Sequence, residues 1–280
     1  MQNNKKNNLI PAKKSLGQNW LKSKIVLQKM LTAGEVNGDD IILEVGPGKG
    51  ILTEKLLAIA KKVIAVEKDN RLIELLQEKF AIAIKSGKLE LVYGDILDFA
   101  IEKPQENPEN LPFPSQTPPQ GETLKISYKI IANIPYYITG QFLRKFLETD
   151  YQPERIVVMV QKEIADRIVA RDRKESILSL SIKAYGEPKK VMKVDKENFS
   201  PVPKVDSAIL LIDNINNDKF GGSVDLKDKF FTLVKAGFSS KRKVLRSNLK
   251  NLLPKEKIES LPPNIRAEDL KLDDWLKLLE

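Results

Sequence analysis

Between Ile41 and Gln161, short runs of β-branched apolar residues alternate with stretches whose apolar residues recur at helical spacing. This alternation is typical of βαβ units, in which crossover helices cover parallel strands. The expected strands are Ile41–Val45, Val63–Glu67, Leu89–Tyr93, Lys129–Asn133 and Arg155–Gln161. The expected helices are Leu52–Ala60, Arg71–Ala83 and Thr139–Leu147. The pattern predicts an α/β doubly wound, Rossmann-like domain.

The remainder of the chain departs from this alternation. Ile177–Lys183, Lys189–Val194 and Ser207–Ile212 are predicted as further strands, among which an antiparallel hairpin could extend or close the sheet. A polar break follows Asp213, and the segments beyond it have helical spacing and many lysines and leucines. We therefore expect one large α/β domain over residues 1–213 and a small all-α domain over residues 214–280.

Residues 102–122 fit neither pattern, because this stretch holds six prolines among glutamine, asparagine and serine. We interpret it as a mobile surface loop. It lies between the third and fourth predicted strands, so it would emerge near the carboxyl edge of the sheet and could gate that edge, although a disordered excursion is the simpler interpretation.

The composition of the chain limits which partners and which catalytic groups it could use. Lysine and arginine number 47 against 38 aspartate and glutamate residues, a formal charge of +9, which favours a polyanionic partner such as nucleic acid. The chain has no cysteine and no histidine. These absences exclude a thiolate nucleophile, a histidine base and a Cys/His zinc site, and we expect no metal. With no signal-like or membrane-spanning apolar run, we expect a soluble cytoplasmic protein.

A glycine turn, ILEVGPGKG, follows the first predicted strand and precedes a helix. Gly46, Gly48 and Gly50 let the backbone approach a ligand without side-chain obstruction. A dinucleotide fingerprint requires G-x-G-x-x-G, whereas the third glycine here comes one residue earlier. This spacing indicates S-adenosylmethionine.

Two acidic residues follow the next two strands. Glu67 ends the strand in VIAVEKD, where its carboxylate could accept hydrogen bonds from both ribose hydroxyls. Asp95, in YGDILDF, could accept a hydrogen bond from the exocyclic amine of the cofactor's adenine. Taken singly, glycines make turns and acids at strand ends are solvated or cap helices. Their order on successive strand ends favours a nucleoside cofactor.

The strongest chemical signal is IIANIPYYITG, at the end of the fourth strand. An adenine exocyclic amine is a poor nucleophile, because its lone pair is delocalised into the ring. The Asn133 side-chain oxygen and the Ile134 carbonyl could accept its two hydrogens, while Pro135 fixes the bend and Tyr136 stacks on the base. The alternative is a helix-initiating turn, with Asn133 as the cap and Pro135 at the first helical position.

Phe199, in ENFSPVPKVDSAIL, precedes prolines that stiffen a loop. Its ring could stack on the other face of an extruded base. A core phenylalanine that anchors the loop is nearly as good an interpretation.

These motifs, EVGPGKGILT, NIPYYITG and FSPVPKVDSAIL, resemble in order those of the ribosomal RNA adenine dimethyltransferases, specifically the small-subunit branch that modifies two adjacent adenines. The resemblance covers most of the chain. The opening KKSLGQNWL looks like that family's amino-terminal signature, and it implies that Asn19 and Leu21 close over the cofactor and that Lys13 and Lys14 meet RNA. Trp20 stands where phenylalanine is commoner, and the insert at 102–122 is longer than the usual connection.

The carboxyl-terminal AGFSSKRKVLRSNL resembles the basic helix of the small-subunit branch. The resemblance implies that Lys241, Arg242, Lys243 and Arg246 meet phosphates, whereas a solvated helical face is the alternative. It also implies that residues 1–213 are catalytic, that residues 214–280 bind RNA, and that the substrate is small-subunit ribosomal RNA. We expect a monomer. Two rival functions are large-subunit RNA methylation that confers antibiotic resistance, and a ribosome-assembly or transcription factor without activity.

Overall fold

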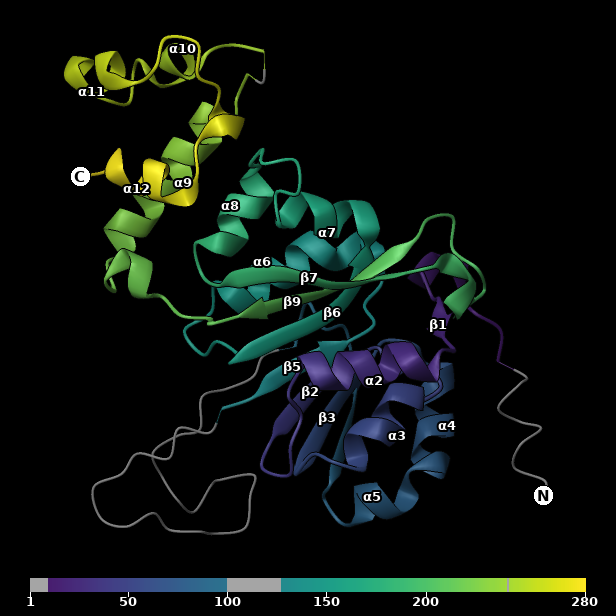
Figure 1. Cartoon of the computed structure of the whole chain (residues 1–280). Helices are drawn as coiled ribbons and strands as arrows, with labels where there is room; N and C mark the ends of the chain where they lie inside the picture. Colours follow the sequence, from purple (N-terminus) through teal and green to yellow (C-terminus); the bar gives the residue numbers. More distant parts are fainter. Residues whose placement is uncertain (1–9, 100–126, 241) are drawn as a thin grey trace, which may run out of the picture.

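The computed structural model describes residues 10–99, 127–240 and 242–280 (Figure 1), so the predicted loop at 102–122 lies outside it. Its centre is a seven-stranded sheet of order β4-β3-β2-β5-β6-β9-β7. The strands are β2 (Ile41–Val45), β3 (Lys62–Glu67), β4 (Leu89–Tyr93), β5 (Lys129–Ala132), β6 (Arg155–Gln161), β7 (Glu187–Val194) and β9 (Ser207–Asp213). Strands β2 to β6 are parallel, and β9 is antiparallel to both of its neighbours. The predicted α/β class and the antiparallel extension are confirmed.

The order of the strands fixes where a ligand can bind. Strands β2 and β5 are neighbours at the centre, and the chain proceeds to β3 and β4 on one side and from β5 to β6 on the other. Such a reversal opens a crevice at the carboxyl ends of the two central strands. The glycine turn and Asn133 both follow these ends.

Helices cover both faces of the sheet (Figure 1). One face carries α2 (Lys24–Ala33), α3 (Ile51–Leu57), α4 (Asn70–Lys79) and α5 (Ala81–Lys85), and the other carries α6 (Thr139–Leu147), α7 (Lys162–Ile168) and α8 (Ile177–Lys183). Strand β6 serves both layers: Val157 and Met159 join the first apolar cluster, whereas Ile156, Val158 and Val160 join the second. Burial on both faces explains the continuous apolar runs of the central strands.

Two predicted elements differ from the structure. The segment Ile177–Lys183 is helix α8, not a strand, because Ser176 caps it: its Oγ accepts from the Ser179 amide (3.1 Å), and Ser179 Oγ accepts from the Ser176 amide (2.7 Å). The single helix predicted over Arg71–Ala83 is divided at Phe80 into α4 and α5.

A pair of very short strands attaches the amino-terminal segment to the sheet domain. Strand β1 (Trp20–Leu21) is antiparallel to β8 (Phe199–Ser200), and the Lys22 amide donates to the Asn198 carbonyl at 2.8 Å. This pairing brings residues 16–20, which begin at the end of the short η1 helix (Lys14–Leu16), to the carboxyl edge of the sheet. No local sequence pattern predicts the pairing.

After β9 the described chain is helical, as predicted. Its elements are η5 (Asp218–Phe220), α9 (Val224–Gly237), α10 (Leu245–Leu249), α11 (Lys255–Ser260), η6 (Ala267–Asp269) and α12 (Leu272–Lys277). Trp275 is fully buried and stacks on Phe238, with ring centroids 6.0 Å apart. In the described ranges, no helix combines the length and apolar character that a membrane crossing requires.

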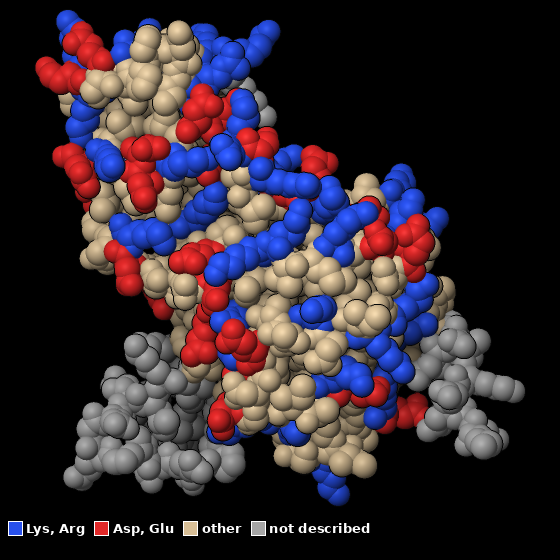
Figure 2. All heavy atoms as spheres, in the orientation of Figure 1, with Lys and Arg blue, Asp and Glu red and all other residues tan. Residues whose placement is uncertain are grey.

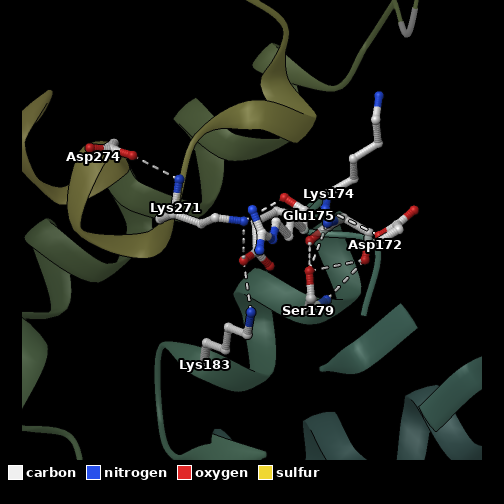
Figure 3. Close-up of polar contacts among 9 residues, drawn as sticks. Asp172, Lys174, Glu175, Ser179, Lys183, Lys271 and Asp274 are labelled. Atoms are coloured by element: carbon white, nitrogen blue, oxygen red, sulfur yellow. Dashed lines mark hydrogen bonds and ion pairs between the residues drawn. The ribbon is translucent and has the colours of Figure 1, made fainter. Parts of the chain in front are cut away.

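A polar cluster joins these helices to the sheet domain (Figure 3). The Glu175 side chain is only 1% exposed, and its Oε1 accepts from Lys183 Nζ of α8 (2.7 Å) and from Lys271 Nζ beside α12 (3.5 Å). The Glu175 amide also donates to the Glu268 carbonyl at 2.7 Å. The buried Glu175 carboxylate is thus paired with one lysine of the sheet domain and one lysine of the carboxyl-terminal helical region.

Candidate active site

A cavity opens over the carboxyl ends of the central strands. It is lined by residues 16–20, 66–68, 94–96 and 133–138, together with Val45, Gly46 and Gly48. The amino-terminal segment, four strand ends and the η3 turn (Tyr136–Ile138) therefore meet at one site.

The glycine turn forms one wall of the cavity. Gly46 and Gly48 have φ angles of 64° and 60°, a left-handed conformation that glycine adopts without strain. A Cβ on Gly48 would also lie 3.1 Å from the Trp20 ring. Lys49 Nζ lies 4.2 Å from the centroid of the same ring, so Trp20 packs across the turn.

Glu67 is held rigidly beside this turn. The side chain is buried, its Oε2 accepts from the Gly48 amide (3.1 Å), and its Oε1 accepts from the Asp69 amide (2.8 Å). Burial raises the pKa of Glu67, and the two amides oppose that effect. Each carboxylate oxygen keeps a second lone pair, so the group can still accept from a pair of hydroxyls.

Asp95 lines the cavity from the end of β4. Its Oδ1 accepts from the Leu97 amide at 3.0 Å, and its Oδ2 is paired with Lys68. Burial alone would raise the pKa of Asp95, but the hydrogen bonds from Lys68 and Leu97 outweigh it and the net pKa is below the ordinary value. Asp95 therefore remains an anionic acceptor.

The reaction loop, residues 133–136, lies opposite these acids. Asn133 Nδ2 donates to the Asn19 carbonyl at 3.0 Å, which orients the amide and leaves Oδ1 as an acceptor. Pro135 has a φ of −58°, and its carbonyl accepts from the Ile138 amide at 3.2 Å to start the η3 turn. Because the Asn133 amide contacts the amino-terminal segment and neither η3 nor α6 has a side-chain cap, the helix-cap interpretation is not supported.

Two tyrosines follow in the same loop. Tyr136 is half-buried and its hydroxyl lies 2.6 Å from Ser207 Oγ, whereas Tyr137 is 62% exposed and lines the cavity beside Gly17. Burial raises the pKa of Tyr136, so its hydroxyl stays neutral near pH 7. The two tyrosines and the acceptor groups of Glu67, Asp95 and Asn133 therefore line the same cavity.

Comparison with known proteins places this site in a family. The profile described as "Ribosomal RNA adenine dimethylase" matches residues 10–280. The chain belongs to the ribosomal RNA adenine dimethylase family. The small-subunit ribosomal RNA methyltransferase A of Dehalococcoides mccartyi is 41% identical over 277 residues, 96% of this chain and 88% of that protein. The corresponding protein of Synechococcus elongatus is 36% identical, over 96% of this chain and 94% of its own length.

Solved structures agree on the fold of this dimethylase. A dimethyladenosine transferase from Plasmodium falciparum superposes with a TM-score of 0.71 at 27% identity, covering 92% of this chain and 95% of that one. The 23S rRNA methyltransferase ErmE also gives 0.71, at 24% identity, over 93% and 98% of the two chains. The second likeness concerns the fold alone.

Several predicted residues of the dimethylase lie away from the cavity. Gly50 is at the start of α3, where a Cβ would lie 2.5 Å from Phe80, so this glycine serves helix packing. Phe199 is fully buried in the core and pairs with Leu21, which is also buried. The core interpretation of Phe199 therefore describes this structure, and its ring is not accessible to a base.

The predicted RNA-binding residues of the dimethylase lie in different surroundings. Lys13 and Lys14 are exposed beside the cavity-lining Leu16. Arg242 and Lys243 are exposed, but they lie in the loop between α9 and α10, not on a helix, and Lys241 lies outside the described residues. The Arg246 guanidinium is partly exposed and donates to the carbonyls of Leu261 and Glu259, which hold it against the helical region.

Sequence reasoning missed the residues that hold the amino-terminal segment in place. Gln18 Nε2 donates to Asp69 Oδ2 at 2.8 Å, and Asp69 is also paired with Arg71. The hydrogen bond from Arg71 is the main reason that the pKa of Asp69 falls to about 2. These contacts depend on tertiary proximity and leave no local signal in the sequence.

Proposed function

We propose that this dimethylase transfers methyl groups from S-adenosylmethionine to the N6 amines of two adjacent adenosines near the 3′ end of small-subunit ribosomal RNA. The products are N6-dimethyladenosines, and the substrate is an assembling small ribosomal subunit in the cytoplasm, on which the enzyme acts as a monomer. The observation that carries the proposal is the Asn133 amide, whose Nδ2 is bound to the Asn19 carbonyl so that Oδ1 is available in the cavity. The small subunit is proposed as the substrate because the relatives are named as small-subunit ribosomal RNA methyltransferases.

The cavity fits S-adenosylmethionine. Glu67, buried and oriented by two backbone amides, would hold the ribose hydroxyls, and Asp95 would accept from the adenine amine. Asn19 and the glycine turn at Gly46 and Gly48 complete the lining. When bound, the cofactor supplies an electrophilic methyl group on a positively charged sulfur.

The chain's own residues align the amine. Asn133 Oδ1 and the Ile134 carbonyl would each accept one N–H, which turns the nitrogen lone pair toward the methyl group. The Tyr136 ring would stack on the base and exclude water from the reacting atoms. A target adenine must leave its stack to reach this loop, which costs less for a loop base than for a duplex base.

The proposal is tested by transfer of radiolabelled methyl groups to small subunits purified from a strain that lacks this gene, followed by nucleoside analysis. We expect labelled dimethyladenosine in the small-subunit RNA. Label confined to large-subunit RNA would contradict the proposed small-subunit substrate and favour a large-subunit methyltransferase that confers antibiotic resistance. No label, with cofactor binding demonstrated, would favour an assembly factor.

In the same assay, Asn133→Ala should lower transfer at least about 100-fold, because it removes an acceptor aimed at the reacting amine. The affinity for S-adenosylmethionine, measured by calorimetry, should change little. Asn216→Ala is a matched control, since the Asn216 amide also donates to a backbone carbonyl but lies away from the cavity. Full activity of Asn133→Ala would remove Asn133 from the mechanism.

A further inference from the structure

Ser207 contacts the reaction loop from a distant part of the chain. It is the first residue of β9, is fully buried, and places its Oγ 2.6 Å from the Tyr136 hydroxyl. Tyr136 follows β5, whereas Ser207 follows the proline-containing loop after β8. This hydrogen bond therefore links the antiparallel extension of the sheet to the loop that would hold the base.

The serine end of the bond is a rigid anchor. Ser207 is paired in register with Gln161 of β6 on one side and with Val194 of β7 on the other. The preceding residue, Asp206, accepts from the Lys162 amide through its carbonyl at 2.9 Å. A backbone paired on both sides cannot shift without breaking the sheet, so Cα and Cβ of Ser207 are fixed and Oγ can move only by rotation about one torsion.

The backbone at the tyrosine end is also fixed. Thr139 Oγ1 donates to the Tyr136 carbonyl at 2.9 Å, and Tyr136 begins the η3 turn. The ring can still rotate about its two side-chain torsions. The hydroxyl oxygen lies on the long axis of the ring, so its contact with Ser207 holds that axis in one direction. A ring that is ordered before the base arrives avoids the entropic cost of ordering on binding.

We propose that Ser207 is a positioning residue that holds the long axis of the Tyr136 ring in place for the target adenine. This inference rests on the proposed function, in which Tyr136 stacks on the base. The bond transfers no proton and stays unchanged through the reaction, so its contribution is orientation alone.

Three variants test the inference: Ser207→Ala, Tyr136→Phe and the double variant. Each single change removes the same hydrogen bond while the ring remains, so each should lower kcat on unmethylated small subunits by about tenfold. The double variant should be no less active than either single one, because both changes remove the same interaction. The dissociation constant for S-adenosylmethionine should stay unchanged, and Ser207→Thr, which keeps the hydroxyl, should restore most of kcat.

A purely structural role for Ser207 is tested by Ser179→Ala. Ser179 is equally buried and hydrogen-bonded, but it lies on α8 away from the cavity. This control should lower the unfolding temperature and leave kcat of the folded enzyme unchanged. Wild-type kcat in Ser207→Ala, or additive effects in the double variant, would overturn the inference.

The variant Tyr136→Ala distinguishes a failure of the Ser207 positioning role from a failure of the proposed function. If this variant is inactive while Ser207→Ala is fully active, the positioning role is wrong and the proposed function stands. If Tyr136→Ala is itself fully active on small subunits, base stacking on Tyr136 is wrong, and the positioning role is overturned with it.

Discussion

At the scale of single residues, the ionisable group beside the site that burial affects most is the Glu44 carboxyl group. Glu44 lies in β2, just before the glycine turn. It is 1% exposed, and its Oε2 has no hydrogen-bond partner among the described residues. Burial raises its pKa from 4.5 to about 8, and the nearby charge of Glu67 adds to the effect. The folded chain therefore keeps a proton that the unfolded chain releases above about pH 4.5.

This difference predicts a pH dependence of stability. The contribution of Glu44 is fully present below about pH 4.5 and declines as pH rises toward 8, at up to about 1.4 kcal/mol per pH unit. Glu44→Gln should remove this decline and be more stable than the wild type at pH 8. Urea denaturation between pH 5 and pH 8 measures the slopes, with the exposed Glu74→Gln as the control. Equal slopes in wild type and Glu44→Gln would contradict the prediction.

Glu67 carries the second prediction at this scale. Its carboxylate would make charge-assisted hydrogen bonds to the ribose, so Glu67→Ala should weaken S-adenosylmethionine binding by about 2–3 kcal/mol. The variant also leaves the amides of Gly48 and Asp69 without their acceptor. Glu67→Gln, which keeps one acceptor oxygen, should weaken binding less. Calorimetric affinities equal to the wild type would exclude Glu67 from the cofactor site.

At the scale of elements, the sequence predicted the parallel strands well. Strands β2, β4 and β6 have the predicted bounds, because each is a short run composed mainly of apolar residues. Helix α8 was missed because apolar and polar residues alternate from Leu178 to Lys183 as they do in a strand, and because its Ser176 cap lacks the usual Glu or Gln partner. Two-residue strands such as β1 and β8 are specified by tertiary contacts, which no local pattern encodes.

The residues of the candidate site also fall into those that the sequence could predict and those that it could not. Glu67, Asp95 and Asn133 could be predicted, because the carboxyl ends of parallel strands meet at one edge. Lys68 and Ser207 could not, since each acts by contacting a residue that is remote in the sequence. Gly50 could not be distinguished from Gly46 and Gly48, because a glycine needed for packing has the same sequence signal as one needed for ligand approach.

Packing of α9 against α12 yields a prediction at this scale. A Cβ on Gly237 would lie 2.3 Å from the Trp275 ring, which is fully buried. Gly237→Ala should therefore destabilise the protein by about 1–3 kcal/mol through overpacking. Gly140→Ala in α6 is the matched control, because nothing lies within 4 Å of its Cβ and the change should stabilise by about 0.5–1 kcal/mol. Thermal unfolding that moves both variants in the same direction would show that the contact with Trp275 is not decisive.

At the scale of the whole molecule, only part of the positive charge is available to a polyanion. Figure 2 shows lysine and arginine side chains interleaved with acidic ones over the sheet domain and the carboxyl-terminal helices. Several lysines of the described chain are already paired, Lys183 with Glu175, Lys190 with Asp166 and Lys174 with Glu268. Such pairs contribute to docking the parts of the chain and add little to attraction of a polyanion.

The phosphate contacts are therefore expected at the exposed loop between α9 and α10. Replacing Arg242 and Lys243 by alanine should weaken binding to unmethylated small-subunit RNA and reduce the salt slope by about 0.7–0.9 for each phosphate that the protein no longer neutralises. Dissociation constants at several KCl concentrations measure that slope. Lys55→Ala with Lys61→Ala is the matched control, since both lysines are exposed, one in the last turn of α3 and the other shortly after it. If the slope of the loop variant equals that of the control, the RNA is held by another surface, and the exposed Lys13 and Lys14 beside the cavity become the next pair to replace.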